Sequence, residues 1–296
     1  MNASRRDVVK HSLAAGGLVA LGLNAFAQNK SAQSARAMRL VSIGGALTEI
    51  IYALRADADL VAVDTTSIYP PAAMQLPSLG YARSLSSEGI LALRPTQLIS
   101  TEDAGPPMVL KQIADAGIPM TILPSHYRLE GVIERVQKIG ELIGKRDAAK
   151  ALIHQVKMQW HQTQDQVASS RVKNRRVLFI LSQNPSQVMV SGDKTSADAV
   201  IAYAGALNAI SGFSGFKPLT PEAVIAANPD VILMTDQGMK AVGGIGGVLR
   251  FPGIDQTRAG KQRKIVSLEA MYLLGFGPRL PMAVADLNAL LQQAIA

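Results

Sequence analysis

The sequence predicts an α/β protein with two Rossmann-like lobes, each built on a parallel sheet, joined by a long connector helix, with a ligand cleft between the lobes. Three observations predict this fold class. Short apolar segments of strand length alternate with segments of helical spacing in both halves of the chain, which is typical of parallel sheets covered by helices. The middle of the chain has helical spacing throughout. One short motif also recurs on either side of that stretch.

The first 27 residues are predicted to be a signal peptide rather than part of the fold. They begin with a basic segment, continue through an apolar stretch too short to span a bilayer, and end in Ala25-Phe26-Ala27, which predicts cleavage after Ala27. The run from Ser4 to Lys10 resembles a twin-arginine export signal, and a general export signal with paired arginines stays the alternative. Residues 28–38 are small and polar and are predicted to form a flexible tether.

The N-terminal lobe is assigned to residues 39–128. A short apolar strand at its start ends at Gly44-Gly45, and the next segment has apolar residues on one helical face. Further strands and helices then alternate, as a parallel sheet requires. The expected strands are 39–43, 60–63, 97–100 and 120–123, and the expected helices include 46–54 and 107–116.

Residues 129–173 are predicted to form the connector helices. The first runs from Leu129 to Ile143 and breaks near Gly144. Asp147 is expected to cap the second, which extends to about residue 170 and would be about 35 Å long. Since a coiled coil would need several apolar heptads, a helix that spans the two lobes is the favoured interpretation.

The C-terminal lobe is assigned to residues 174–296, with strands at 177–181, 231–234 and 264–266 and a closing helix at 283–295. Residues 88–101 can be aligned with residues 222–235, because Glu, Ala, Pro and Thr match at identical spacing. Each copy predicts a helix, a proline-containing turn and a buried strand. Duplicated lobes would leave such a repeat, and chance similarity is the alternative for so short a match.

The composition excludes several classes of function. The chain has no cysteine, which excludes a disulfide scaffold, a thiolate metal site, an iron–sulfur cluster, a cysteine nucleophile and a lipid anchor on an N-terminal cysteine. Export without such an anchor favours the bacterial periplasm. The net charge is +8, or +6 without the leader, and indicates either an acidic partner or a solvated basic surface. No nucleic-acid partner is predicted.

Catalytic motifs are absent, so the chain is predicted not to be an enzyme. The segment 212–216 places its second glycine one position too early for a nucleophile elbow, and the glycine-rich segment 243–247 lacks the Walker lysine. His154 and His161 could share a helix face, but no carboxylate at suitable spacing completes a metal site. Solvated histidines are the favoured interpretation.

The segment Asp64 to Pro71 is the strongest candidate for a binding loop. It follows the second expected strand, and open α/β sheets bind ligands beyond the carboxyl ends of their strands. Pro70 and Pro71 favour an extended Tyr69, which can direct its ring outward. The alternative is a tyrosine that covers the apolar base of the loop.

From about residue 39 to its end, the chain resembles the substrate-binding proteins of the vitamin B12, siderophore and haem ABC importers. The long connector and the repeated blocks around Pro95 and Pro229 fit that family. Within the family, the sequence is similar to the haem-binding branch. The segments that carry the resemblance are 42–54 for the family, and 66–70, 79–89 and 273–281 for the haem-binding branch.

The resemblance implies that Tyr69 is the ligand of the haem iron. A phenolate is a hard oxygen donor that suits ferric iron, and the charge of a metal lowers the pKa of a phenol bound to it. Relatives often carry an arginine or lysine two residues after this tyrosine, but here that position is Pro71. The cation must therefore come from elsewhere.

The resemblance also implies contacts around the haem. Arg83 is the first candidate for a propionate partner, and a solvated surface arginine is its alternative. Relatives can supply a second contact from the C-terminal lobe, sometimes a histidine, but no histidine follows His161. The candidates for this contact are Lys240, Met239, Arg250 and Tyr272.

Family members dock on a twofold permease through one glutamate from each lobe. Glu88 and Glu222 occupy matching places in the two copies of the repeat, so they are the expected pair. Glu49 has no counterpart and is less favoured. Both glutamates could also be helix N-terminal charges favoured by the macrodipole.

Taken as a member of this family, the protein is expected to be a periplasmic binding protein. It would capture ferric haem between its lobes and deliver it to the ABC permease dimer of the inner membrane, with an outer-membrane haem receptor upstream. A helix linker would keep closure small. The alternatives are a ferric-siderophore or cobalamin binding protein of the same fold, and, less favoured, a periplasmic enzyme.

Overall fold

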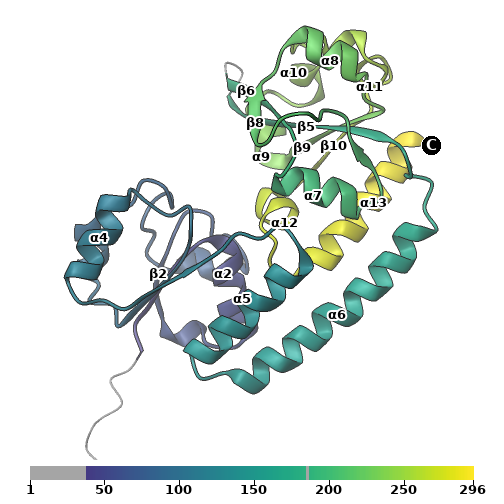
Figure 1. Ribbon diagram of the computed structural model, residues 1–296. Helices are drawn as coiled ribbons and strands as arrows, with labels where there is room; N and C mark the ends of the chain where they lie inside the picture. Colours follow the sequence, from purple (N-terminus) through teal and green to yellow (C-terminus); the bar gives the residue numbers. More distant parts are fainter. Residues whose placement is uncertain (1–37, 185–186) are drawn as a thin grey trace, which may run out of the picture. The chain divides into compact units, whose positions relative to one another are not determined.

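The structure, a computed structural model, describes residues 38–184 and 187–296 of the chain (Figure 1). The predicted signal peptide, and the predicted tether up to residue 37, lie outside these residues. Within the described residues, no helix combines the length and the apolar composition needed to cross a bilayer. Residues Arg39–Ala296 belong to one compact unit.

The N-terminal sheet is wholly parallel, with strand order β2–β1–β3–β4. The inner strand β1 is completely buried, which explains its mostly apolar composition, with Ser42 as its one polar residue. Because all four strands run the same way, the loops that follow them meet at one edge of the sheet. The strands are β1 (Leu40–Ile43), β2 (Leu60–Val63), β3 (Gln97–Thr101) and β4 (Met120–Leu123).

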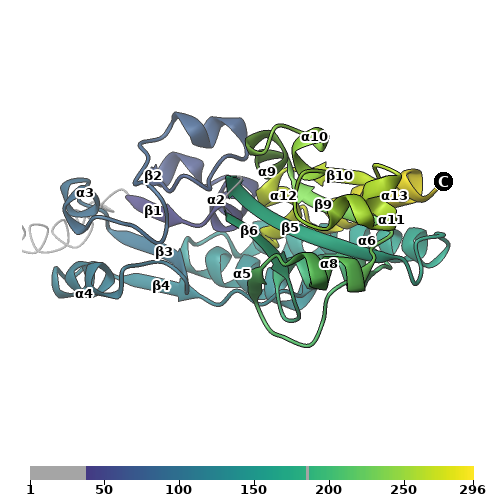
Figure 2. The ribbon, with the colours of Figure 1, turned by 90° about the horizontal axis from the view of Figure 1, so that it is seen from above.

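Helices follow the strands of this lobe as the periodicity predicts. Helix α2 begins directly after β1, while α3 and α4 pack against each other at the outer end of the lobe (Figure 2). The helices are α2 (Gly45–Ala53), η2 (Asp57–Asp59), η3 (Pro71–Gln75), α3 (Ser87–Ala92) and α4 (Pro107–Asp115).

The C-terminal sheet is mixed, so the prediction of a parallel sheet is wrong for this lobe. Its strand order is β10–β9–β5–β6–β8, with β7 beside β5. Strands β10, β9, β5 and β7 are parallel, but β6 pairs antiparallel with both β5 and β8. Since β5 ends at Asn184 and β6 begins at Gln187, the connection is too short for the crossover that a parallel pair needs. The strands are β5 (Arg176–Asn184), β6 (Gln187–Ser191), β7 (Leu207–Asn208), β8 (Phe216–Pro218), β9 (Val231–Thr235) and β10 (Ile265–Leu268).

The helices of the C-terminal lobe are mostly short, and the last one is the longest. They are α7 (Ser196–Tyr203), α8 (Pro221–Ala227), α9 (Asp236–Ala241), α10 (Ile245–Val248), η4 (Ile254–Gln256), α11 (Arg258–Lys261), α12 (Ala270–Leu274) and α13 (Leu280–Ile295).

The connector consists of α5 (Leu129–Leu142) and α6 (Arg146–Ala168), as the spacing predicts. Gly144 turns the chain between them with a φ of 70°, a conformation that glycine adopts without strain. Helix α6 packs against α5 and against α13 of the C-terminal lobe, and α5 in turn packs against α2 of the N-terminal lobe (Figure 1). The expected cap is wrong: Lys145 is the N-cap residue, and Asp147 lies in the first turn, where its charge complements the macrodipole.

The two copies of the repeat have the same local structure. In each, a short helix with the glutamate at its second position, α3 or α8, leads through a proline turn to a buried strand, β3 or β9. The residue before each proline, Arg94 or Asn228, has a positive φ, of 48° and 36° respectively. The match therefore extends from the sequence to the backbone.

Candidate functional site

A buried carboxylate fixes the loop that carries Tyr69. Asp64 is 2% exposed and accepts hydrogen bonds from the Gly44 backbone N–H at 2.9 Å, the Thr66 hydroxyl at 2.6 Å and the Ser67 hydroxyl at 2.9 Å. These bonds join the loop after β2 to the turn between β1 and α2. The loop is therefore held against the sheet edge by the hydrogen bonds of one side chain.

The turn itself admits only glycine. The Gly45 N–H donates to the Thr66 hydroxyl at 2.8 Å, and a Cβ at this position would lie 2.3 Å from the Thr66 carbonyl oxygen. Gly44 has a φ of 122°, which side chains rarely adopt. The double glycine thus lets the binding loop approach the start of α2.

Tyr69 lies at the far end of this loop. The residue is 42% exposed, and its hydroxyl has no hydrogen-bond partner among the described residues. The guanidinium carbon of Arg279 lies 3.6 Å from the centroid of the Tyr69 ring and 4.9 Å from that of Tyr272. Arg279 thus lies against two tyrosines, one from each lobe, and leaves the Tyr69 hydroxyl available.

Glu49 on α2 holds Arg279. Its Oε2 accepts from Arg279 Nη2 at 2.9 Å and Nε at 3.0 Å, and its Oε1 accepts from the Arg279 backbone N–H at 3.2 Å. Both side chains are largely buried. Burial raises the pKa of the Glu49 carboxyl above its ordinary value, and the hydrogen bonds and charge of Arg279 offset only part of this. The ion pair therefore carries a considerable desolvation cost.

The segment around Arg279 is a junction of three parts of the molecule. Arg135 on α5, which is buried, donates Nη2 to the Phe276 carbonyl at 2.6 Å, and Thr163 on α6 donates its hydroxyl to the Pro281 carbonyl at 3.0 Å. Burial lowers the pKa of Arg135 to about 10. Together with Glu49, these bonds tie one segment of the C-terminal lobe to α2, α5 and α6.

A cavity of about 450 Å³ lies beside this junction. Its walls come from α2, the Tyr69 loop, α6 and the start of α13. The lining includes Glu49, Tyr52, Tyr69, Pro70, Gln155, Gln159, Pro278, Arg279 and Met282. The ring of Tyr69 therefore borders open space within the same unit that contains both lobes.

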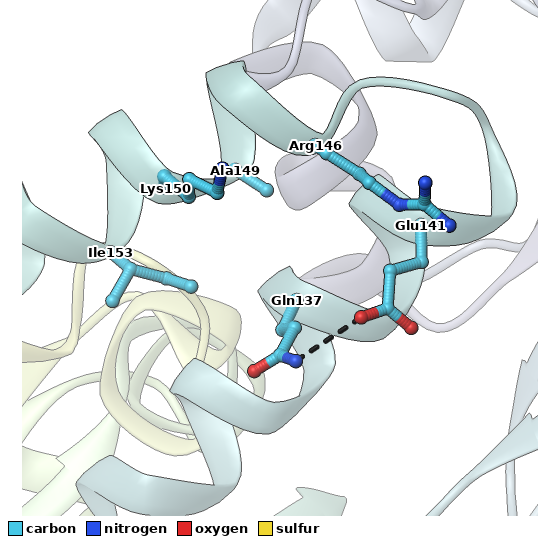
Figure 3. Close-up of a pocket in the computed structure, with 6 residues that line it drawn as sticks. All are labelled: Gln137, Glu141, Arg146, Ala149, Lys150 and Ile153. Atoms are coloured by element: carbon cyan, nitrogen blue, oxygen red, sulfur yellow. Dashed lines mark hydrogen bonds between the residues drawn. The ribbon is translucent and has the colours of Figure 1, made fainter.

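A second pocket, of about 270 Å³, lies between α5 and α6 (Figure 3). Its lining includes Gln137, Glu141, Arg146 and Lys150, and Gln137 donates to Glu141 at 3.1 Å. None of the residues predicted for binding lines it. This pocket therefore belongs to the connector and not to the candidate site.

Residues 40–272 match the family of periplasmic binding proteins. The chain belongs to this family. Family and structural neighbours are binding proteins of transport systems rather than enzymes, which confirms the prediction that the chain is not an enzyme. They also confirm the two-lobed α/β fold, with the correction that the second sheet is mixed.

Two solved structures are similar over nearly the whole described chain. One is the periplasmic haem-binding protein BhuT in complex with two haems, at 43% identity and a TM-score of 0.84, covering 87% of this chain and 99% of that one. The other is the periplasmic haem-binding protein RhuT from Roseiflexus sp. RS-1 without ligand, at 40% identity and a TM-score of 0.85, covering 88% and 100%. The vitamin B12-binding protein of Vibrio cholerae is 24% identical over 205 residues, covering 69% of this chain and 72% of its own.

In this binding protein, Tyr272 is the one predicted C-terminal residue that shares contacts with Tyr69, through Arg279. Its hydroxyl donates to Asp286 at 2.8 Å. Burial raises its pKa above the ordinary value, and the Asp286 hydrogen bond adds to this. Tyr272 is thus already engaged as a donor, which makes it a poor candidate for a phenolate ligand.

The other predicted contacts do not line the cavity beside Tyr69. Arg83 forms an exposed ion pair with Asp103, with Nη2 2.6 Å from Oδ2. Lys240 and Arg250 are exposed, and Met239 packs against the core of the C-terminal lobe. Among the described residues, these four side chains form no hydrogen bond, ion pair or ring contact with Tyr69.

Glu88 and Glu222 are exposed at the second positions of α3 and α8, and neither has an ion-pair partner among residues 38–184 and 187–296. His154 and His161 are exposed on α6. In the described part of the chain, no group of three potential ligands could hold a metal ion.

Sequence reasoning missed the role of Arg279 and did not place Glu49 in the site. A signal for Glu49 exists in the helix pattern, since it lies beside Ile50 and Ile51 in a nearly wholly buried helix. A carboxylate at such a position needs a cation. Arg279 lies within the segment 273–281 that carried the resemblance, but its partner is distant in sequence.

Removal of either partner of the Glu49–Arg279 pair is expected to destabilise the protein. We expect Arg279→Gln or Glu49→Gln to lower the free energy of unfolding by about 3–5 kcal/mol, because each leaves a buried charge unpaired. Urea denaturation of the protein without ligand measures this. The matched control is Lys111→Gln, which breaks the exposed pair with Asp115 and should change stability by less than about 1 kcal/mol. Equal losses in the three variants would contradict the assignment of a buried pair.

Proposed function

We propose that this binding protein captures ferric haem between its two lobes, with Tyr69 as the ligand of the iron. The observation that carries the proposal is the exposed Tyr69 ring on a loop fixed by Asp64, with a hydroxyl that has no partner within residues 38–184 and 187–296. The similarity to two haem-binding proteins at 40% identity or more supports the choice of ligand. A phenolate is a hard donor that suits ferric iron.

Five other tyrosines are the competitors for the iron. Tyr52 also lines the cavity, but burial raises its pKa, and Tyr203 packs against Trp160. Tyr272 donates to Asp286 and is disfavoured by its raised pKa. Tyr81 and Tyr127 are 45% and 42% exposed, but the bonds that fix the loop of Tyr69 do not reach them, and neither lines the cavity beside Arg279. Tyr69 therefore combines availability with a fixed position better than the others.

We propose charged contacts for the two propionates and a second contact to the haem. Arg83 remains the candidate for a propionate, because it is exposed and could share its guanidinium between Asp103 and an anionic ligand. Lys240 and Arg250 are exposed cations of the C-terminal lobe and remain candidates there. Met239 and Tyr272 are less suitable, because one packs in the core and the other is hydrogen-bonded.

The second candidate ligand is a cobalamin, favoured by the similarity to the vitamin B12-binding protein. That similarity covers less of the chain, and at lower identity, than the similarity to the two haem-binding proteins. The single tryptophan lies on α6 and pairs with Tyr203, so it is engaged outside the cavity beside Tyr69. A ferric siderophore is the remaining ligand of the same class of binding protein.

Titration with hemin tests the ligand and Tyr69 together. We expect the protein to take up hemin and to show the charge-transfer absorbance of tyrosinate-bound ferric iron. Tyr69→Phe should remove that band and weaken binding by at least about tenfold, since the iron loses its anionic ligand. Tyr272→Phe is the matched control and should keep the band.

Two results would contradict this proposal. One is a Tyr69→Phe variant with unchanged spectrum and affinity, which would move the ligand elsewhere. The other is wild-type protein that binds cyanocobalamin and not hemin under the same conditions.

We further propose that the protein works in the periplasm and delivers haem to the permease dimer of an ABC importer, with an outer-membrane haem receptor upstream. The leader would direct export and be cleaved after about Ala27. Glu88 and Glu222 would contact the two permease subunits. Their equivalent positions on α3 and α8, and their exposed carboxylates, support this pairing with a twofold partner.

Glutamate substitutions separate docking from haem binding. The double variant Glu88→Gln/Glu222→Gln should bind the reconstituted permease at least about tenfold more weakly, because it loses two charge contacts. Its hemin affinity should stay unchanged. Glu141→Gln, on the exposed surface of α5, is the control and should dock normally. Normal haem delivery by the double variant would refute the docking assignment.

A further inference from the structure

The loop from Asp64 to Pro71 contains no lysine or arginine, so Tyr69 has no cation on its own loop. Among the described residues, the cation that lies over the Tyr69 ring is Arg279 of the C-terminal lobe, at 3.6 Å. This distance is well within the range of a cation–π contact. The loop that would present the ligand is thus complemented from the opposite lobe.

We infer that Arg279, held by Glu49, is a positioning residue that fixes the Tyr69 ring and stabilises the negative charge of its phenolate when iron is bound. This inference rests on the proposed function. The N-terminal lobe would supply the phenolate oxygen of Tyr69, and the C-terminal lobe would supply the positive charge of Arg279 that balances it. Haem binding is then coupled to the contact between the lobes.

The geometry of Arg279 supports a positioning role. Two of its side-chain nitrogens and its backbone N–H bind one carboxylate, so the guanidinium plane cannot rotate freely. The Tyr69 ring lies against this fixed guanidinium, whose carbon is 3.6 Å from the ring centroid. The ring therefore has a defined orientation before any ligand arrives.

The energetic cost of burying the Glu49–Arg279 ion pair indicates that the pair has a role other than stabilising the fold. A buried ion pair often gives no more stability than well-packed apolar residues would, because both charges lose their hydration. Glu49 and Arg279 border the cavity beside the exposed Tyr69 ring rather than a region remote from it. A role in orienting the Tyr69 ring and in stabilising its phenolate explains why the ion pair lies beside this cavity.

The charges around Arg279 predict that removal of Arg279 and removal of the Glu49 charge change the reduction potential of the bound iron in opposite directions. Glu49 neutralises it directly, Glu269 at the start of α12 adds negative charge near Glu49, and Tyr272 with Asp286 lies on its other side. Loss of Arg279 leaves the Tyr69 phenolate among negatively charged groups. Loss of the Glu49 charge leaves an unbalanced cation over Tyr69. A structural role alone would give both losses the same effect.

The experiment measures hemin affinity and the reduction potential of the iron in the hemin-loaded mature protein. Arg279→Gln should weaken hemin binding about tenfold, because the phenolate loses its stabilising charge. It should also lower the potential, since a less compensated phenolate favours ferric iron. Glu49→Gln should shift the potential upward and leave affinity unchanged or higher.

Two further variants guard against simple loss of structure. Arg279→Lys keeps the charge and should restore most of the affinity and potential. Arg258→Gln breaks the ion pair with Asp230, of 2.6 Å, and should lower stability without moving the potential. If Arg279→Gln does not fold, Glu49→Gln still decides: an upward shift of its potential supports the inference, and an unchanged or lower potential overturns it.

The inference is overturned if Arg279→Gln and Glu49→Gln shift the potential in the same direction, or if neither shifts it. Failure of the proposed function would look different. In that case the wild-type protein would not bind hemin or would lack the tyrosinate band, before any of these variants is made.

Discussion

The buried ion pair between Glu49 and Arg279 is the interaction on which the rest of the site depends. It joins α2 of the N-terminal lobe to the segment that opens α13, and it places a guanidinium under the ring of Tyr69. Burial makes the charged form of Glu49 costly, so the pair requires close and well-oriented hydrogen bonds. The bonds from Arg135 and Thr163 to the same segment keep that geometry in place.

The N-terminal sheet positions the elements of the site along one of its edges. Parallel strands bring the loops after β1 and β2 together, and Asp64 locks them into one surface. The connector packs against both lobes, through α5 on α2 and through the 23-residue α6 on α13, and a helical linker of this kind resists wide hinge motion. Under the proposed function, such a protein would present Tyr69 in a nearly fixed position, and the permease would drive release.

Periodicity was sufficient to predict the strands of the N-terminal lobe and the connector, because each strand contains a short apolar segment and α6 has regular helical spacing. It failed for β6, which turns back after the short connection from β5, and for β8, which pairs with β6 across α7 and β7. Tyr69 was predictable from its place after a strand and from the family resemblance. Arg279 was not, because Glu49 lies 230 positions away and only tertiary structure joins them. The contacts of Arg83, Lys240 and Arg250 likewise depend on side-chain positions that no local pattern encodes.

A crystal structure of the hemin-loaded protein tests the central claim most directly. The account predicts iron bonded to the Tyr69 hydroxyl oxygen, with the Arg279 guanidinium still against the ring and still bound by Glu49. Iron bonded to Tyr81, Tyr127 or a side chain of the C-terminal lobe, with Arg279 turned away from Tyr69, would contradict it.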